Sequence, residues 1–277
     1  MKIGLALSGG GMLGVAHIGL LQELDKNNIK IGAIAGVSAG AIIGLLYSSG
    51  GVKAIDNFIE DLGKAGLFSR GGLILNMTPD KIFDQIRSAL RKNVAEEHFY
   101  ELPVKFQCVL TNLITGEAEV IKHGNPVDAV MASAAYPGVF SVQKLGGNFY
   151  IDGAITLNLP CKTAREMGAD FVISSSLYSV GKINSFDDKG NLKTSRATIA
   201  LRAVDIMQKE LAKISMKKCD FCFTPPIESY NWWDFNRIAE IRKVGEEYAR
   251  ENIGALEGKL GLTKPKKRNF LEKLLGS

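Results

Sequence analysis

The sequence predicts a protein of the α/β class, built as a three-layer α/β/α sandwich around a mostly parallel central sheet. Short apolar runs typical of buried strands alternate along the chain with longer segments of helical periodicity. The apolar fraction of 46% and the charged fraction of 23% are ordinary for a globular protein and exclude a disordered chain. The length of 277 residues suits one or two domains, and no linker-like stretch divides the chain.

The first third of the chain predicts two strand–helix pairs. A buried strand is expected at 3–8, followed by a helix at 14–26. The uncharged stretch 31–52 is long enough to cross a membrane, but its six glycines favour a buried strand at 31–37, a tight turn and a helix from 39 to about 49. Thr78 and Pro79 supply the N-cap and first-turn proline of a further helix.

The remaining chain predicts two hairpins followed by more strand–helix alternation. The first hairpin joins 104–113 to 118–123, and the second joins 142–145 to 148–152 across two glycines. A short helix is expected at 126–135 and a buried strand at 171–177. Helices at 196–217 and 234–252 enclose a strand at 220–224, and the polar segment 178–196 predicts a loop.

The four cysteines predict no disulfide framework, because they are too few for a chain of this size. Cys219 and Cys222 have the spacing of a redox or zinc motif, but they lie in a predicted strand. A redox pair of this kind opens a helix, and a zinc site needs more ligands. Structural roles are therefore expected for these cysteines.

The charge pattern bears on location and partners. The N-terminus has no pattern of a secretory signal, so a cytoplasmic protein is expected. The net charge is +5, and the last 25 residues account for +4 of it. The segment 256–277 is a basic amphipathic tail that either contacts an anionic membrane surface peripherally, at the inner face, or docks on the body. This confined charge, without interleaved aromatic residues, argues against nucleic acid.

The segment Gly36-Val-Ser38-Ala-Gly40 fits the G-x-S-x-G nucleophile elbow between a strand and a helix. A serine on so sharp a turn needs neighbours without side chains two positions away. The helix that follows directs its N–H groups and partial positive charge at the hydroxyl, which favours developing negative charge. The alternative is a glycine-rich buried helix packed closely against its neighbours.

The segment Gly9-Gly-Gly-Met-Leu-Gly14 follows the first predicted strand and matches G-x-G-x-x-G. A dinucleotide site would also need an acidic residue at the end of the second strand, and 27–38 contains none. The second interpretation is an oxyanion hole, in which exposed backbone N–H groups face the serine. A phosphate or nucleotide site and a plain turn remain as alternatives.

A serine nucleophile needs a base, and the chain has only His17, His98 and His123. All three precede residue 124, which leaves little room for the serine–acid–histidine order of an α/β-hydrolase. A carboxylate acting directly as the base is the natural alternative. Asp152 is the best candidate, because it ends an apolar strand and is followed by Gly153 and Ala154.

Four segments together resemble a bacterial patatin-like phospholipase: the glycine loop at 9–14, the elbow at 36–40, the stretch 132–140, and Asp152-Gly-Ala154 with Asn158-Leu-Pro160. The resemblance covers residues 1 to about 177 and implies a phospholipase domain at 1–255 that cleaves lipid acyl esters. It implies Ser38 as nucleophile, Asp152 as base, and an oxyanion hole from the backbone of Gly9, Gly10, Gly11 and Met12. Supporting roles fall to Gly14, Gly36, Gly40, Gly153, Ala154 and Asn158, with no metal and no organic cofactor.

Two features separate this chain from the family pattern or leave its substrate open. Leu13 stands where the family usually has arginine or lysine, which affects how the loop is held or meets a lipid phosphate. The segment 71–75 and the pair Trp232-Trp233 are candidate lipid contacts, each with packing as the alternative. A lipid acyltransferase with the same dyad, and a nucleotide- or phosphate-binding protein, remain as alternative functions.

Overall fold

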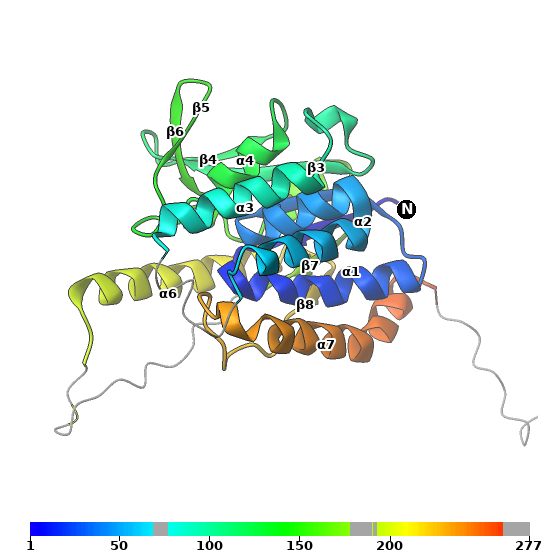
Figure 1. The fold of residues 1–277 in the computed structure, drawn as a ribbon. Coiled ribbons are helices and arrows are strands. Elements are labelled where there is room, and N and C mark those ends of the chain that lie inside the picture. The colour runs from blue at the N-terminus through cyan, green and yellow to red at the C-terminus, as the bar shows by residue number, and fades with distance from the viewer. Residues whose placement is uncertain (69–76, 178–189, 191–192, 263–277) are drawn as a thin grey trace, which may run out of the picture.

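The computed structural model describes residues 1–68, 77–177, 190 and 193–262, which form an α/β fold around one mixed sheet (Figure 1). The sheet order is β5-β6-β3-β2-β1-β7-β8, with β4 also paired to β3. The strands are β1 (Ile3–Leu7), β2 (Ile31–Val37), β3 (Lys105–Asn112), β4 (Ala118–Ile121), β5 (Gln143–Leu145), β6 (Asn148–Asp152), β7 (Phe171–Ser175) and β8 (Phe221–Phe223).

The centre of the sheet is parallel, as the sequence predicts. Strand β1 lies between β2 and β7, and both pairings are parallel, as are those of β2 with β3 and β7 with β8. Strands β4, β5 and β6 add antiparallel pairings at one edge. After β1 the chain adds β2 and β3 on one side of that strand, and it later adds β7 and β8 on the other side. In parallel sheets such a change of direction leaves a crevice beyond the carboxyl ends of the strands.

Helices cover both faces of the sheet. They are α1 (His17–Lys26), α2 (Ala39–Lys64), α3 (Pro79–Asn93), α4 (Pro126–Ser133), α5 (Cys161–Glu166), α6 (Arg196–Met216) and α7 (Ile238–Lys259). Short 3₁₀ turns lie at Gly11–Ala16, Phe99–Glu101, Gly153–Ile155 and Phe235–Arg237. Helix α1 packs between α2 and α7 on one face (Figure 1). Helix α5 packs on the other face, with α6 beside it.

The alternation of side chains along β1 divides the core between the two faces. Leu5 and Leu7 are fully buried in the larger core, under α1, α2 and α7. Ala6 points the other way, into a smaller core that includes Ala164 of α5 and Ala212 of α6. The small side chains on this second face let α5 approach the sheet closely.

Most predicted elements are present, with local differences at helix starts. The expected helix at 14–26 begins as a 3₁₀ turn and becomes α-helical at His17. The helix after the elbow continues to Lys64 across a break at Gly50 and Gly51. The helix expected from residue 234 is preceded by the 3₁₀ turn Phe235–Arg237 and begins at Ile238. Helix α7 ends at Lys259, beyond the domain boundary expected at residue 255.

No helix in the described part of the chain is both long and apolar enough to cross a bilayer. The uncharged stretch 31–52 is divided between β2 and α2, as its glycines predict. The candidate lipid loop 71–75, most of the polar segment 178–196 and the tail from 263 onward lie outside the described residues.

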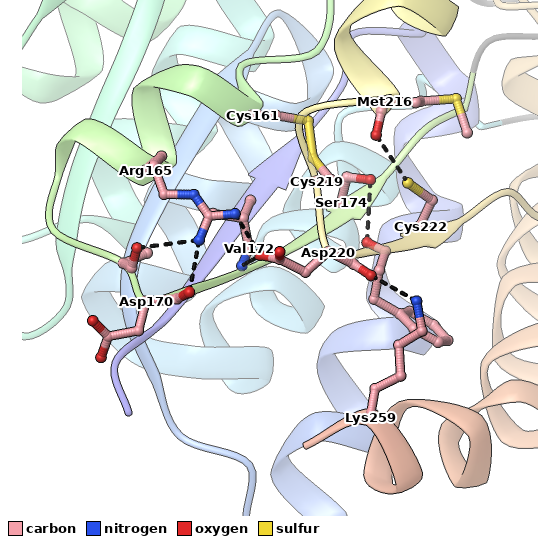
Figure 2. Close-up of polar contacts among 12 residues, drawn as sticks. Cys161, Arg165, Asp170, Val172, Ser174, Met216, Cys219, Asp220, Cys222 and Lys259 are labelled. Atoms are coloured by element: carbon pink, nitrogen blue, oxygen red, sulfur yellow. Dashed lines mark hydrogen bonds and ion pairs between the residues drawn. A yellow bond between two sulfur atoms is a disulfide. The ribbon is translucent and has the colours of Figure 1, made fainter. Parts of the chain in front are cut away.

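The cysteines depart from the prediction. Cys161, the first residue of α5, forms a disulfide with Cys219, which precedes β8 (Figure 2). Cys222 remains a free thiol on β8, and its Sγ donates to the carbonyl of Met216 at 3.6 Å. The motif spacing therefore does not pair Cys219 with Cys222, because residues three apart on an extended chain point in different directions.

The same region carries a polar network around Asp220 (Figure 2). The Asp220 carboxylate accepts from the Val172 N–H at 2.6 Å and from the Arg165 guanidinium, and its carbonyl accepts from Lys259 Nζ at 2.9 Å. These bonds and the disulfide together join α5, β7, β8 and the end of α7.

Candidate active site

Ser38 lies at the turn between β2 and α2, in a conformation that few residues adopt. Its φ is 52° and its ψ is −123°, and a positive φ in a non-glycine residue is a strained state typical of functional sites. The two elbow glycines make this turn possible. A Cβ at Gly36 would lie 2.5 Å from the carbonyl oxygen of Gly40, and a Cβ at Gly40 would lie 2.4 Å from that of Leu7.

Asp152 ends β6 and lies directly beside the serine. Ser38 Oγ donates to Asp152 Oδ2 at 2.6 Å, and the other carboxylate oxygen accepts from the Ala154 N–H at 2.8 Å. Gly153 must be glycine, because a Cβ there would lie 2.0 Å from the carbonyl oxygen of Val109. Thr111 Oγ1 donates to the Asp152 carbonyl at 2.9 Å, which fixes the end of the strand.

The Asp152 carboxyl is almost inaccessible, with 1% of the residue exposed. Burial raises its pKa from 3.8 to about 7, because the charged form loses hydration. The hydrogen bonds from Ser38 and the Ala154 N–H favour the charged form and oppose part of this rise. A carboxyl with a pKa near neutrality accepts a proton far better than an ordinary aspartate.

Ser133 of α4 positions the elbow, a role that the sequence did not reveal. Its Oγ accepts from the Ser38 N–H at 2.9 Å and donates to the Val109 carbonyl at 2.7 Å. Ser133 is fully buried, so this bridge between β3, α4 and the elbow is shielded from water. The only signal in the sequence is a polar residue within an apolar helical segment.

In the glycine loop after β1, two of the four backbone N–H groups expected to form an oxyanion hole are already hydrogen-bonded within the protein. The Gly9 N–H donates to Asn158 Oδ1 at 2.9 Å, and the Met12 N–H donates to the Trp232 carbonyl at 2.8 Å. These bonds hold the loop, and they correct the expectation that Gly9 and Met12 present free N–H groups. Among the described residues, no acceptor is hydrogen-bonded to the N–H of Gly10 or Gly11.

The loop depends on close contacts at its glycines. Gly11 has a φ of +56°, and a Cβ there would lie 2.5 Å from the Trp232 carbonyl oxygen. A Cβ at Gly14 would lie 2.7 Å from that of Ala39, the first residue of α2. Leu13 is buried at 3% exposure and packs in the main core, so a packed apolar side chain stands where the family usually has arginine or lysine.

The histidines lie where they cannot serve Ser38, as expected from their positions. His17 is fully buried on α1, with Nδ1 2.8 Å from Ser175 Oγ and Nε2 3.0 Å from the Ser8 carbonyl oxygen. Burial lowers its pKa to about 4, so the ring is neutral at physiological pH. His98 caps the turn Phe99–Glu101, and His123 lies exposed beyond β4.

A pocket of about 1120 Å³, including solvent at its open mouth, leads to Ser38 and Asp152. Its wall is mostly apolar and includes Ile42, Phe83, Ile86, Phe140, Trp232, Trp233 and Phe235. The tryptophan rings form an aromatic cluster, since Trp232 packs against Tyr136 at 5.4 Å and against Trp233 at 5.2 Å between ring centroids. The pair therefore packs together while also lining the pocket, and the lipid contact that the sequence allows for it stays a prediction.

The pocket also has a polar side, formed by α6 and the loop after α4. Tyr136 donates from its hydroxyl to Asp205 Oδ1 at 2.9 Å. Burial raises the pKa of Asp205, and the bond from Tyr136 and the charge of Arg202 oppose part of this rise. The pocket therefore combines a long apolar wall with a few polar groups, as sites for lipid-like molecules require. Among the described residues, no cluster of three or more histidine, cysteine or acidic side chains has the geometry of a metal site.

Comparison with known proteins identifies relatives across the whole fold. A patatin-like phospholipase domain-containing protein of Caenorhabditis elegans is 26% identical over 90% of this chain, and the lysophospholipase NTE1 of Coccidioides immitis is 26% identical over 94%. The chain spans about a fifth of the length of these relatives, 20% and 18% respectively. An NTE family protein of Mycobacterium tuberculosis is 30% identical over 64% of the chain and 49% of its own length.

Structural comparison supports the same fold. The crystal structure of VipD from Legionella pneumophila superposes with a TM-score of 0.53 at 14% identity, covering 92% of this chain and 67% of VipD. The relatives come from an animal, a fungus and a mycobacterium, so they do not single out a bacterial branch. The family profile described as patatin-like phospholipase matches residues 5–165, more than half of the sequence, and the chain therefore belongs to the patatin-like phospholipase family.

Proposed function

We propose that the protein is a serine hydrolase that cleaves carboxylic esters of lipids, with Ser38 as nucleophile and Asp152 as base. The observation that carries this proposal is the 2.6 Å hydrogen bond between Ser38 Oγ and a buried carboxyl whose pKa is about 7. Nucleophile and base are thus in direct contact, with no histidine between them. The names of two relatives, a phospholipase domain protein and a lysophospholipase, favour a lipid ester as substrate.

The proposed reaction has two steps. Ser38 Oγ attacks the ester carbonyl while its proton passes to Asp152, and the N–H groups of Gly10 and Gly11 stabilise the oxyanion. Asp152 then returns the proton to the leaving alcohol, which departs from the acyl-enzyme. Water attacks the acyl-enzyme with Asp152 again as base, which releases the fatty acid and restores Ser38.

The pocket supports an acyl chain as the group held beside Ser38. The side chains of Ile42, Phe83, Ile86 and Phe140 line the pocket and have no polar atoms to leave unpaired against a hydrocarbon chain. The same dyad can pass the acyl group to an alcohol instead of water, so an acyltransferase is the second candidate. The glycine loop gives little support to a nucleotide site, because two of its N–H groups are occupied within the fold.

The proposal is tested by hydrolysis of a lysophospholipid, followed as released fatty acid. Ser38→Ala and Asp152→Asn should each lower kcat/KM by on the order of a thousandfold or more, since each removes one half of the dyad. Ser229→Ala and Asp84→Asn are matched controls, because both residues are exposed and lie outside the site. Adding a short alcohol tests the second candidate, since an acyltransferase would form the new ester in place of free acid.

Wild-type turnover that survives in Ser38→Ala would show that another group attacks the ester. Loss of turnover in Ser229→Ala equal to that in Ser38→Ala would show that the assay follows folding rather than chemistry. The first result would contradict the assigned dyad, and the second would show that the loss in Ser38→Ala is not specific to the dyad.

A further inference from the structure

Helix α6 has its polar and apolar residues arranged opposite to those of an ordinary surface helix. Its buried residues are Gln208, Ala212 and Ser215, which are polar or small. Five of its large apolar residues instead face outward: Ile199, Ile206, Met207, Leu211 and Ile214 are between 36% and 57% exposed. Helices in globular proteins bury such residues against the core.

This exposed set is concentrated rather than scattered. The residues Ile199, Ile206, Met207, Leu211 and Ile214, here called the α6 outer face, account for five of the fourteen large hydrophobic side chains that are exposed in the described part of the chain. Isolated exposed apolar residues need no explanation, but a contiguous set on one helix face marks a contact surface.

A row of lysines runs beside the α6 outer face. Lys209, Lys213 and Lys217 are spaced four residues apart and therefore lie along one side of the helix. Glu210 is the only acidic residue among the outward-facing positions, and it pairs with Lys213 at 2.7 Å. A large apolar face beside a basic row is the pattern of helices that lie in the interface of an anionic membrane.

The position of α6 connects this surface to the pocket. Its inner side contributes Arg202, Asp205 and Gln208 to the pocket wall, and Asp205 is bonded to Tyr136 of the body. In Figure 1 the first half of α6 projects beyond the sheet and the neighbouring helices, and the α6 outer face is exposed along both halves of the helix. A surface that binds the α6 outer face therefore comes to lie next to the wall of the pocket that leads to Ser38.

We propose that the α6 outer face binds the surface of an anionic lipid bilayer, with the helix lying in the interface and the lysine row against the lipid headgroups. The proposal rests on the residues of α6 and not on the proposed function. If the protein cleaves lipid esters, a bilayer bound in this way would also supply the substrate next to the pocket. A second copy of the chain would cover the apolar residues without any need for the adjoining cations. A nucleic acid would engage the lysines and leave the apolar residues exposed.

The test is co-sedimentation of the full chain with vesicles of phosphatidylcholine, with and without phosphatidylglycerol. Wild type should bind the mixed vesicles, and binding should weaken as salt rises. Lys209→Gln, Lys213→Gln and Lys217→Gln together should lower the partition coefficient by on the order of a hundredfold. Ile206→Glu with Ile214→Glu should lower it by about tenfold or more.

Matched controls carry the same changes elsewhere. Lys30→Gln, Lys122→Gln and Lys162→Gln remove three exposed lysines from other surfaces, and Ile114→Glu with Val120→Glu changes two exposed apolar residues near the first hairpin. Both control variants should bind vesicles within about twofold of wild type. The proposal would be overturned if the α6 variants bound vesicles with the same partition coefficient as wild type. It would also be overturned if wild type were a dimer that the α6 substitutions convert to a monomer.

A soluble short-chain ester separates this inference from the proposed function. Its hydrolysis should be unchanged in the α6 variants, because Ser38 and Asp152 are untouched. Vesicle binding that depends on α6, with hydrolysis that survives in Ser38→Ala, would refute the proposed function alone. Intact Ser38-dependent hydrolysis with vesicle binding independent of α6 would refute the membrane inference alone.

Discussion

Ser38 and Asp152 each occupy a state that the isolated residue disfavours. The serine has a positive φ, and the carboxyl is buried with a pKa of about 7. Such states persist only where the surroundings determine them, and here the glycines on both sides and the Ser133 bridge do so. The raised pKa also answers a chemical difficulty, because an aspartate of ordinary pKa is a poor base for an alcohol.

The raised pKa predicts how activity depends on pH. Asp152 acts as base only when ionised, and burial moves its ionisation from near 3.8 to about 7. The rate should therefore rise from about pH 5 and level off above about pH 8, with its midpoint near 7. The measurement is kcat/KM for a short-chain ester across this range, together with the thermal midpoint at each pH. A flat profile on folded protein would mean that the carboxyl titrates at its ordinary value.

At this scale the sequence predicted the pair Ser38 and Asp152 and the small residues beside them, but not the contacts made by Ser133 and by the Trp232 carbonyl. Asp152 was predicted as the base because no histidine follows residue 123 and because two small residues follow this aspartate. The roles of Ser133 and the Trp232 carbonyl could not be read from the sequence, since each depends on a contact between segments about 95 or more residues apart. The backbone bonds that occupy the Gly9 and Met12 N–H groups arise in the same way.

The strands and helices position Ser38 and Asp152 at tight turns, which the neighbouring glycines make possible. Elements with strong local signals were predicted well, such as α3 with its Thr78 cap and Pro79, and the hairpin at 142–152. The outward-facing apolar residues of α6 were not recognised, because helical spacing alone does not say which face a helix buries. The disulfide was missed because its cysteines are 58 residues apart and meet only when α5 packs against the approach to β8.

The disulfide predicts a stability that depends on redox conditions. Closing a loop of 58 residues restricts the unfolded chain and contributes roughly 4 kcal/mol in the chain-entropy treatment. Adding dithiothreitol should lower the thermal midpoint of wild type toward that of Cys161→Ala with Cys219→Ala, which should itself not respond to reductant. Cys222→Ala is the matched control and should respond as wild type does. An unchanged wild-type midpoint after reduction would contradict a stabilising bond.

The whole molecule brings the site together from segments spread along the chain. Ser38 and Asp152 are 114 residues apart, and Met12 of the glycine loop is bonded to Trp232, which comes from the last part of the described chain. They meet because the loops after β1 and β2 open at the same edge of a parallel sheet, where β6 pairs with β3. The fold class was predictable from alternation, but this convergence requires the sheet order that the structure provides.

The central claim is that Ser38 is an activated nucleophile, and labelling with a fluorophosphonate tests it most directly. The probe reacts covalently with activated serines, and mass spectrometry locates the adduct. We predict a single adduct on Ser38 of the folded protein, absent from Ser38→Ala and from heat-unfolded wild type. No adduct on folded wild type, or equal labelling of another serine in Ser38→Ala, would contradict the account.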